Sequence, residues 1–369
     1  MLSVLGGGLL LAVVLAEAFE ALVLPRRVTR SYRLTRLYYR TAWGMWKALG
    51  ALVPARWRQT WLSVFGPLSL LLLFVVWAVG LVIGFGLLQH AVSPALPLPD
   101  ALYLSGATFT TLGYGDITPS GYAGRALAVL EAGTGFGYFA VVVGYLPVLY
   151  QAFSRRETLI SMLDARAGSP PSAGRLLLRA GPAGGVAVGR FLERAEEWAA
   201  ELLESHLSYP VLGYYRSQHD NQSWLAALTC VLDTCAVLLT VVEGADRTQA
   251  RLTFAMARHT VVDLGLILRR RPEVPAEDRL SDARLGELLA ALQAVGVKVR
   301  DDTTARTRLA ELRGLYESFV AGLATHFRLT VPPVWPADEK PDNWQTSAWM
   351  RRADPLTALG ADPTDDHFD

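Results

Sequence analysis

The stretch Thr110-Thr111-Leu112-Gly113-Tyr114-Gly115-Asp116 lies between two long apolar segments and decides how the surrounding chain folds. Residues 67–88 contain no charged residue, and residues 121–153 contain only Arg125 and Glu131. Each is long enough to cross a bilayer, which needs about 20 apolar residues of helix. Residues 100–109 form an apolar run too short to cross, with Asp100 where a helix N-cap belongs. Non-helical backbone at membrane depth must be buried in protein or line a water-filled path. Because the glycine-rich loop lies between a short helix and the second span, we expect it to line such a path.

The residues from Thr111 to Asp116 resemble the selectivity filter of the potassium channel family, and the resemblance covers about residues 61–153. It implies passive conduction of K⁺, with K⁺ as the permeant ion and no cofactor. It also implies that the backbone carbonyls of Thr111, Leu112, Gly113 and Tyr114, with the Thr111 hydroxyl, replace the water around the ion. Gly113 and Gly115 adopt positive φ at little cost, which lets successive carbonyls face one axis. Leu112 stands where the family more often has valine.

Four further residues are expected to support this filter: Thr110, Gly115, Asp116 and Tyr103. In two-transmembrane bacterial potassium channels, an acid in the pore helix often partners the filter aspartate. The matching position here is Ala107. We therefore expect Tyr103 to hydrogen-bond Asp116 instead.

The last span contains the residues expected to form the gate. By alignment on the filter, Gly135 falls at the hinge glycine of the family. Pro147 removes a helical hydrogen bond near the cytoplasmic mouth, which predicts a kink there. The alternative for the glycines of this span is close helix packing through small residues.

One chain supplies one filter loop, whereas a closed ring needs four, so the simplest assembly is a homotetramer. The predicted fold is an all-α membrane protein: a tetrameric potassium-channel pore with an extra N-terminal transmembrane helix and an all-α cytoplasmic C-terminal domain. The expected parts are a transmembrane helix (1–24), a basic amphipathic interfacial or cytoplasmic segment (25–61), the pore domain (62–153), a linker (154–187), a helical regulatory domain (188–330) and a loosely ordered tail (331–369).

The segment between Arg26 and Arg58 carries nine Lys or Arg and no acidic residue. Arginines recur there at every third residue from Arg27 to Arg36, which is also the spacing of a voltage-sensing helix. The intervening residues are only half apolar, so we favour a helix lying on the anionic lipids of the inner leaflet. These two alternatives place the N-terminus on opposite sides of the membrane. The positive-inside rule puts the segment, and the C-terminal domain, on the cytoplasmic side of an inner membrane.

Acidic residues inside the spans are costly and are expected to have partners. Glu131 is expected to face protein near the back of the pore helix. Glu17 and Glu20 share one face of the first span, and we favour a position at the membrane boundary for them.

The C-terminal half shows helical periodicity from Val188 onward and no Gly-x-Gly-x-x-Gly after a strand. A net charge of +1 gives no reason to expect nucleic acid as a partner. Residues 224–242 are apolar enough to suggest another span, but Asp233 favours a buried core helix. His259 and Asp263, spaced i and i+4, can share a metal ion, and the alternative for such residues is hydrogen bonding or capping. The candidate ligand or metal site comprises His206, His219, Asp220, His259 and Asp263.

The sequence thus predicts a potassium channel gated through its helical domain by a regulatory ligand or other stimulus that the sequence does not identify. The first alternative is a weakly selective cation channel on the same scaffold. The second, from another class, is a membrane-anchored ligand or metal sensor whose pore is secondary. No nucleophile–base–acid constellation is present, so we do not expect an enzyme.

Overall fold

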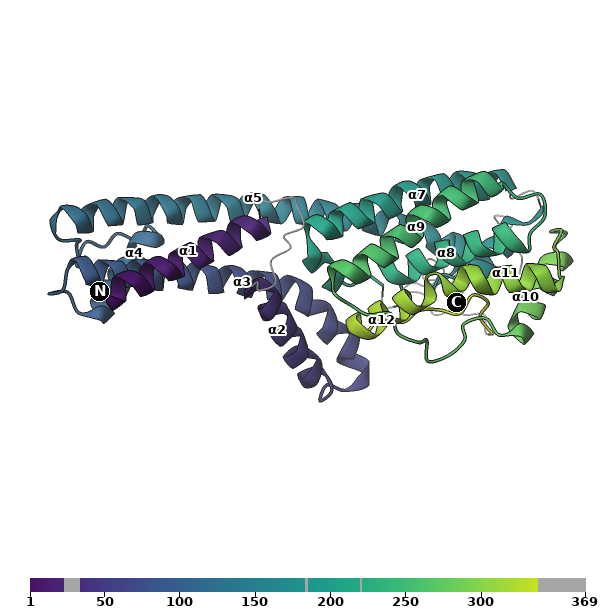
Figure 1. Cartoon of the computed structure of the whole chain (residues 1–369), viewed down its shortest axis with the longest axis horizontal. Helices are drawn as coiled ribbons and strands as arrows, with labels where there is room; N and C mark the ends of the chain where they lie inside the picture. Colours follow the sequence, from purple (N-terminus) through teal and green to yellow (C-terminus); the bar gives the residue numbers. More distant parts are fainter. Residues whose placement is uncertain (23–33, 183–184, 220, 338–369) are drawn as a thin grey trace, which may run out of the picture. The chain divides into compact units, whose positions relative to one another are not determined.

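The computed structural model describes residues 1–22, 34–182, 185–219 and 221–337, and within these ranges its regular secondary structure is helical apart from one isolated bridge between Val242 and Val299 (Figure 1). Within them, three helices are long and apolar enough to cross a membrane: α1 (Leu2–Leu22), α3 (Ala55–Val92) and α5 (Gly121–Ala167). The predicted all-α membrane fold is confirmed. The chain divides into two compact units, Met1–Gln151 and Ala152–Asp369, and the division falls within α5.

In the first unit, α1 packs along α3 through small residues (Figure 1). A Cβ atom added to Gly7 would lie 2.7 Å from the backbone oxygen of Gly84. One added to Gly84 would lie 2.7 Å from the side chain of Leu11. The absence of side chains at these two positions lets the helix backbones approach closely, which is how apolar helices associate in lipid.

A helical hairpin is formed by α2 (Leu34–Gly50) and the first turns of α3. The rings of Trp46 and Trp61 stack with centroids 4.1 Å apart, and each indole N–H donates to the other residue's backbone carbonyl, at 3.0 and 3.1 Å. At the start of α2, Glu17 of α1 accepts from the backbone N–H groups of Leu34 and Thr35. The part of the basic segment that includes Arg26, Arg27, Arg30 and Arg33 lies outside the described residues.

The short helix α4 (Leu98–Phe109) packs against α3. It begins after Pro97, so Asp100 lies in its first turn and is not the N-cap that the sequence predicts. The reason is that prolines 97 and 99 start the helix before Asp100. Asp100 in the first turn is still stabilised by the positive end of the helix dipole. Close approach of α3 and α4 depends on Gly86, where an added Cβ would lie 2.7 Å from Leu102.

The second unit is a bundle whose central helix is α8 (Trp224–Thr240), buried along nearly its whole length. Both α7 (Gly185–Ser208) and α9 (Arg247–Ile267) pack on it, and the two lie side by side in Figure 1. The hypothesis of a buried core helix therefore agrees with the structure. The bundle is completed by α6 (Ala173–Ala180), the 3₁₀ helix η2 (Pro210–Tyr214), α10 (Asp282–Ala294), α11 (Thr303–Gly314) and α12 (Glu317–Phe327).

Two segments that the sequence predicts to be a linker and a loose tail differ in the structure. Residues 154–187 are not a plain linker: α5 extends to Ala167 and α6 follows. Buried Leu159, Ile160 and Leu163 keep this stretch folded, and residues 168–172, which are Gly, Ser and Pro, form the turn between α5 and α6. The tail expected to be loose from 331 begins with packed residues, because Val334 is buried and its backbone pairs with Arg279 and Gly174.

Candidate functional site

The candidate filter, residues 110–116, follows directly on the C-terminus of α4. The N–H of Thr110 donates to Gly106 O at 3.0 Å, and the N–H of Leu112 turns back to Ala107 O at 2.8 Å. Gly113 and Gly115 have φ of 62° and 77°, the left-handed backbone expected from the sequence. Thr111 shares it, with φ of 58°, which sequence reasoning missed. A left-handed threonine costs on the order of 1–3 kcal/mol and persists where the surroundings impose it, which is typical of functional loops.

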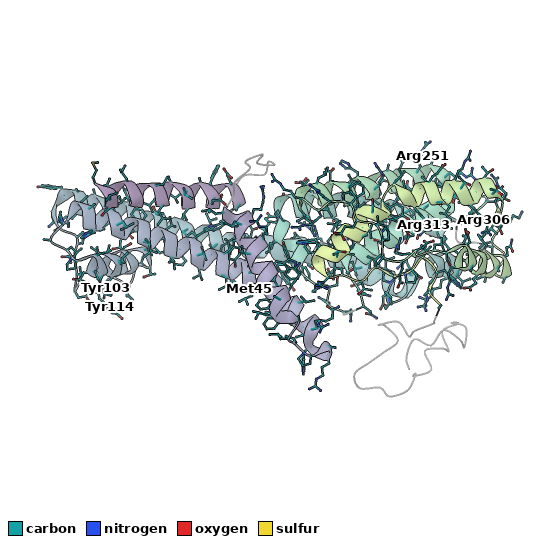
Figure 2. All side chains as sticks on the ribbon, turned by 60° about the horizontal axis from the view of Figure 1, so that its bottom comes forward. Met45, Tyr103, Tyr114, Arg251, Arg306 and Arg313 are labelled. Atoms are coloured by element: carbon teal, nitrogen blue, oxygen red, sulfur yellow. The ribbon has the colours of Figure 1, made fainter. Side chains whose placement is uncertain are left out.

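Side-chain hydrogen bonds form at and just beyond the C-terminal end of the candidate filter. Tyr103 donates its hydroxyl to Asp116 Oδ1 at 3.1 Å, which is the contact expected from the sequence. Figure 2 shows Tyr103 and Tyr114 together at one end of the first unit, with Met45 of the α2 hairpin far from them. Gln89 of α3 is fully buried and donates to Gly124 O of α5 at 3.2 Å. The first bond holds the C-terminal end of the loop against α4, and the second joins α3 to the first turn of α5.

Behind the pore helix α4, a buried acid from α5 meets a buried hydroxyl. Glu131 has no exposed surface and is hydrogen-bonded to Ser105 Oγ of α4. The same Ser105 Oγ donates to Val82 O of α3 at 2.7 Å. Glu131 thus lies where the sequence places it, near the back of the pore helix, but Ser105 as its partner was not foreseen because no local pattern marks it.

Gly135 lies against the last residue of α4. An added Cβ would lie 2.2 Å from Phe109 O, which is backbone and cannot yield as a flexible side chain can. One turn further along α5, the Tyr138 hydroxyl donates to Phe74 O of α3 at 2.6 Å. The structure gives Gly135 a packing role, and α5 is helical through both Gly135 and Pro147. The gating roles of Gly135 and Pro147 stay predictions.

Replacing Gly135 with alanine is expected to displace α4 from α5, because the new methyl group and Phe109 O cannot occupy the same space. We expect a loss of about 1–3 kcal/mol of stability, the usual cost of overpacking. Thermal unfolding of the purified protein measures it. Gly286→Ala is the matched control, because Gly286 lies on α10 and an added Cβ there has nothing within 4 Å. Equal melting temperatures for the two variants would contradict the packing role.

Comparison of the amino-acid sequence with known proteins identifies the family of this chain. Residues 70–151, which contain α4, the candidate filter and most of the two flanking spans, match the family model described as "Ion channel". Protein LctB of Bacillus caldotenax is 37% identical over 93 residues, covering 21% of this chain and 69% of the relative. The chain belongs to the ion channel family. Protein LctB of Geobacillus stearothermophilus is 52% identical over 46 residues, covering 12% of this channel and 34% of that relative. No solved structure matches.

In the second unit of this channel, the residues predicted to bind a ligand or metal are not gathered in one place. His206 is buried, with Nδ1 at 2.8 Å from Leu202 O, and His219 is exposed. His259 and Asp263 pair on α9, with 3.8 Å between Nε2 and Oδ2. Asp220 lies outside the described residues. Over the described ranges, no group of three or more His, Cys, Asp or Glu is placed to hold a metal ion.

His206 makes the second unit sensitive to acid. Burial, and then the charge of Arg156, lower the pKa of His206 from 6.5 to about 3. Between those two values the unfolded chain binds a proton that the folded chain does not, so stability falls as pH falls through this range. We expect a loss of about 2 kcal/mol between pH 7 and pH 5 from this residue. His206→Phe should flatten the dependence of the melting temperature on pH, whereas the exposed control His219→Phe should not. Parallel profiles for the wild type and His206→Phe would rule out this role.

The sequence did not predict a buried cluster of charged and polar side chains in the second unit. Asp233, on the buried face of α8, pairs through both carboxylate oxygens with Arg279, at 2.8 and 2.9 Å. Tyr316 also donates to Asp233, and Glu317 contacts Arg279 at 3.3 Å. The only sequence signal was a single acid within an apolar helix. The cluster connects α8, α12 and the segment before α10, so its role is structural.

Proposed function

We propose that this protein is one subunit of a potassium-selective channel, with residues 111–114 binding the ion. The observation that carries the proposal is the backbone of the candidate filter, where left-handed Thr111, Gly113 and Gly115 alternate with other residues. This alternation lets successive carbonyls face one axis, as a dehydrated K⁺ requires. The comparisons support an ion channel, and potassium selectivity is our inference from residues 111–116.

The homotetramer is proposed from the surface of α5. Of the apolar 18-residue stretch that could cross a membrane, only 11% is buried within one chain in α5, against 44% in α3. Phe136 and Val143 are more than two-thirds exposed, and Tyr114 of the candidate filter is 75% exposed. One copy of the loop cannot enclose an ion, so these surfaces are assigned to contacts among four subunits and to the pore. Native mass spectrometry of the purified protein should give four times the subunit mass.

The membrane setting is proposed from the charges. From the excess of Lys and Arg between α1 and α3 we infer that this segment, and with it the second unit, lies on the cytoplasmic side of an inner membrane. The α2 hairpin contains basic residues such as Arg40 and Lys47, and exposes Met45 and Leu52. We assign it to the interface with anionic lipids.

Gating is proposed to act through α5, which belongs to both units. In the second unit, buried Arg156 of α5 donates to Leu212 O and Tyr215 O, at 2.8 and 3.0 Å. Its own carbonyl accepts from the Trp198 indole of α7 at 2.9 Å. A stimulus that repositions α7 or η2 would therefore move the end of α5, and it would change the gate if it binds the open and closed states unequally.

The test is the reversal potential of the purified protein in planar bilayers with K⁺ on one side and Na⁺ on the other. We expect a large shift toward the potassium equilibrium potential. A reversal near zero would replace the proposal with its alternative, a weakly selective cation channel on the same scaffold.

A further inference from the structure

Behind the candidate filter, a buried hydrogen bond joins Ser105 and Glu131. Ser105 Oγ lies within hydrogen-bond distance of two acceptors, Val82 O and Glu131 Oε1. A serine hydroxyl has one proton, and a backbone carbonyl has none to give. Both bonds form together only if the Ser105 proton goes to Val82 O and Glu131 supplies the proton of the other bond.

The surroundings of Glu131 favour the same assignment. Its second oxygen, Oε2, is buried and has no hydrogen-bond partner within the part of the chain that the structure describes. No ion pair to Glu131 occurs among those residues, and its side chain is fully buried. A carboxylate would leave a buried charged oxygen without a donor from the described residues, which is far more costly than leaving a carbonyl oxygen so placed.

We propose that Glu131 is a neutral carboxylic acid that donates to Ser105 and so holds the pore helix between α3 and α5. The chain of bonds runs from Glu131 of α5 through Ser105 of α4 to Val82 of α3. It therefore joins the two spans through the helix that ends at the candidate filter. Glu131 is a positioning residue: it touches no ion and acts through α4. The proposal deepens the channel function proposed above and rests on it.

Glu17 provides the matched control, because it is also a buried acid in a span but only accepts hydrogen bonds. Its oxygens accept from Leu34 N–H, Thr35 N–H and the Thr35 hydroxyl. Glu131→Gln keeps a donor toward Ser105, whereas Glu131→Ala and Ser105→Ala each remove one end of the bridge.

The test combines infrared spectroscopy with K⁺ flux, both on the full-length protein in lipid vesicles. The wild-type-minus-Glu131→Gln infrared spectrum is expected to contain the C=O band of a protonated carboxylic acid, absent from the wild-type-minus-Glu17→Gln spectrum. Glu131→Gln is expected to keep the K⁺ flux and the melting temperature of the wild type. Glu131→Ala and Ser105→Ala are expected to lose most of the flux and to melt at lower temperature.

Two results would each overturn the proposal: a carboxylate band in place of the protonated one, or a Glu131→Gln variant as impaired as Glu131→Ala. If Glu131→Ala does not fold, Ser105→Ala and Glu131→Gln still decide between these outcomes. A wild type that conducts Na⁺ as readily as K⁺ would refute the proposed potassium-selective function, whereas the infrared band and the melting temperatures would still decide the state of Glu131.

Discussion

Replacing Asp233 with alanine is expected to lower the free energy of unfolding of the second unit by about 3–5 kcal/mol, the usual cost of breaking a buried ion pair. The Asp233 side chain is 3% exposed and that of Arg279 is 13% exposed. Removing the carboxylate leaves the guanidinium inside the bundle with Glu317 at 3.3 Å as its remaining ion-pair partner. The Tyr316 hydroxyl, which is buried, also loses its acceptor.

Hydrogen exchange of the α8 amides in the full-length protein measures this loss without requiring the unit to be isolated. The matched control is Asp278→Ala, which also breaks an arginine pair, with Arg313 at 2.7 Å. The Asp278 side chain is 58% exposed, so water screens the pair and a cost below about 1 kcal/mol is expected. Equal acceleration of exchange in the two variants would show that burial does not determine the strength of these pairs.

The parts of the pore that the sequence predicted are those that local patterns determine. Two long apolar spans, a short helix between them and the glycines of the candidate filter are each visible in the local sequence, and the structure contains all of them. The contact between Tyr103 and Asp116 was also expected, from the absence of an acid at position 107. Local signals succeed here because a membrane allows few backbone arrangements.

The features that the sequence did not predict depend on contacts between distant segments. Ser105 meets Glu131 across 26 residues, and Asp233 meets Arg279 across 46. The linker predicted at residues 154–187 from glycine, proline and alanine is wrong, because Leu159 and Leu163 of this stretch are buried in the core. The scattered histidines were grouped by residue type, whereas the fold separates buried His206 from exposed His219.

Replacing Gly113 with alanine is expected to abolish potassium selectivity. Gly113 has φ of 62°, where a side chain costs about 1–2 kcal/mol per residue. In the proposed tetramer the cost is incurred four times around one axis. The backbone can escape it by rotating the Gly113 peptide, and this rotation turns a carbonyl away from the ion. A ring whose carbonyls point away from the ion no longer replaces the hydration shell of K⁺. The reversal potential measured between K⁺ and Na⁺ should therefore move to near zero.

A second measurement does not depend on current. An ion that binds the folded tetramer raises its stability by mass action, so K⁺ should raise the melting temperature of the wild type above its value in Na⁺. Gly113→Ala should lose this difference. Gly286→Ala is the matched control, because Gly286 lies on α10 with nothing within 4 Å of an added Cβ. If Gly113→Ala kept both the wild-type reversal potential and the stabilisation by K⁺, residues 111–114 would not be the site that selects the ion. The left-handed backbone at Thr111 would then need another explanation, because such strain in a residue other than glycine persists only where the surrounding structure imposes it.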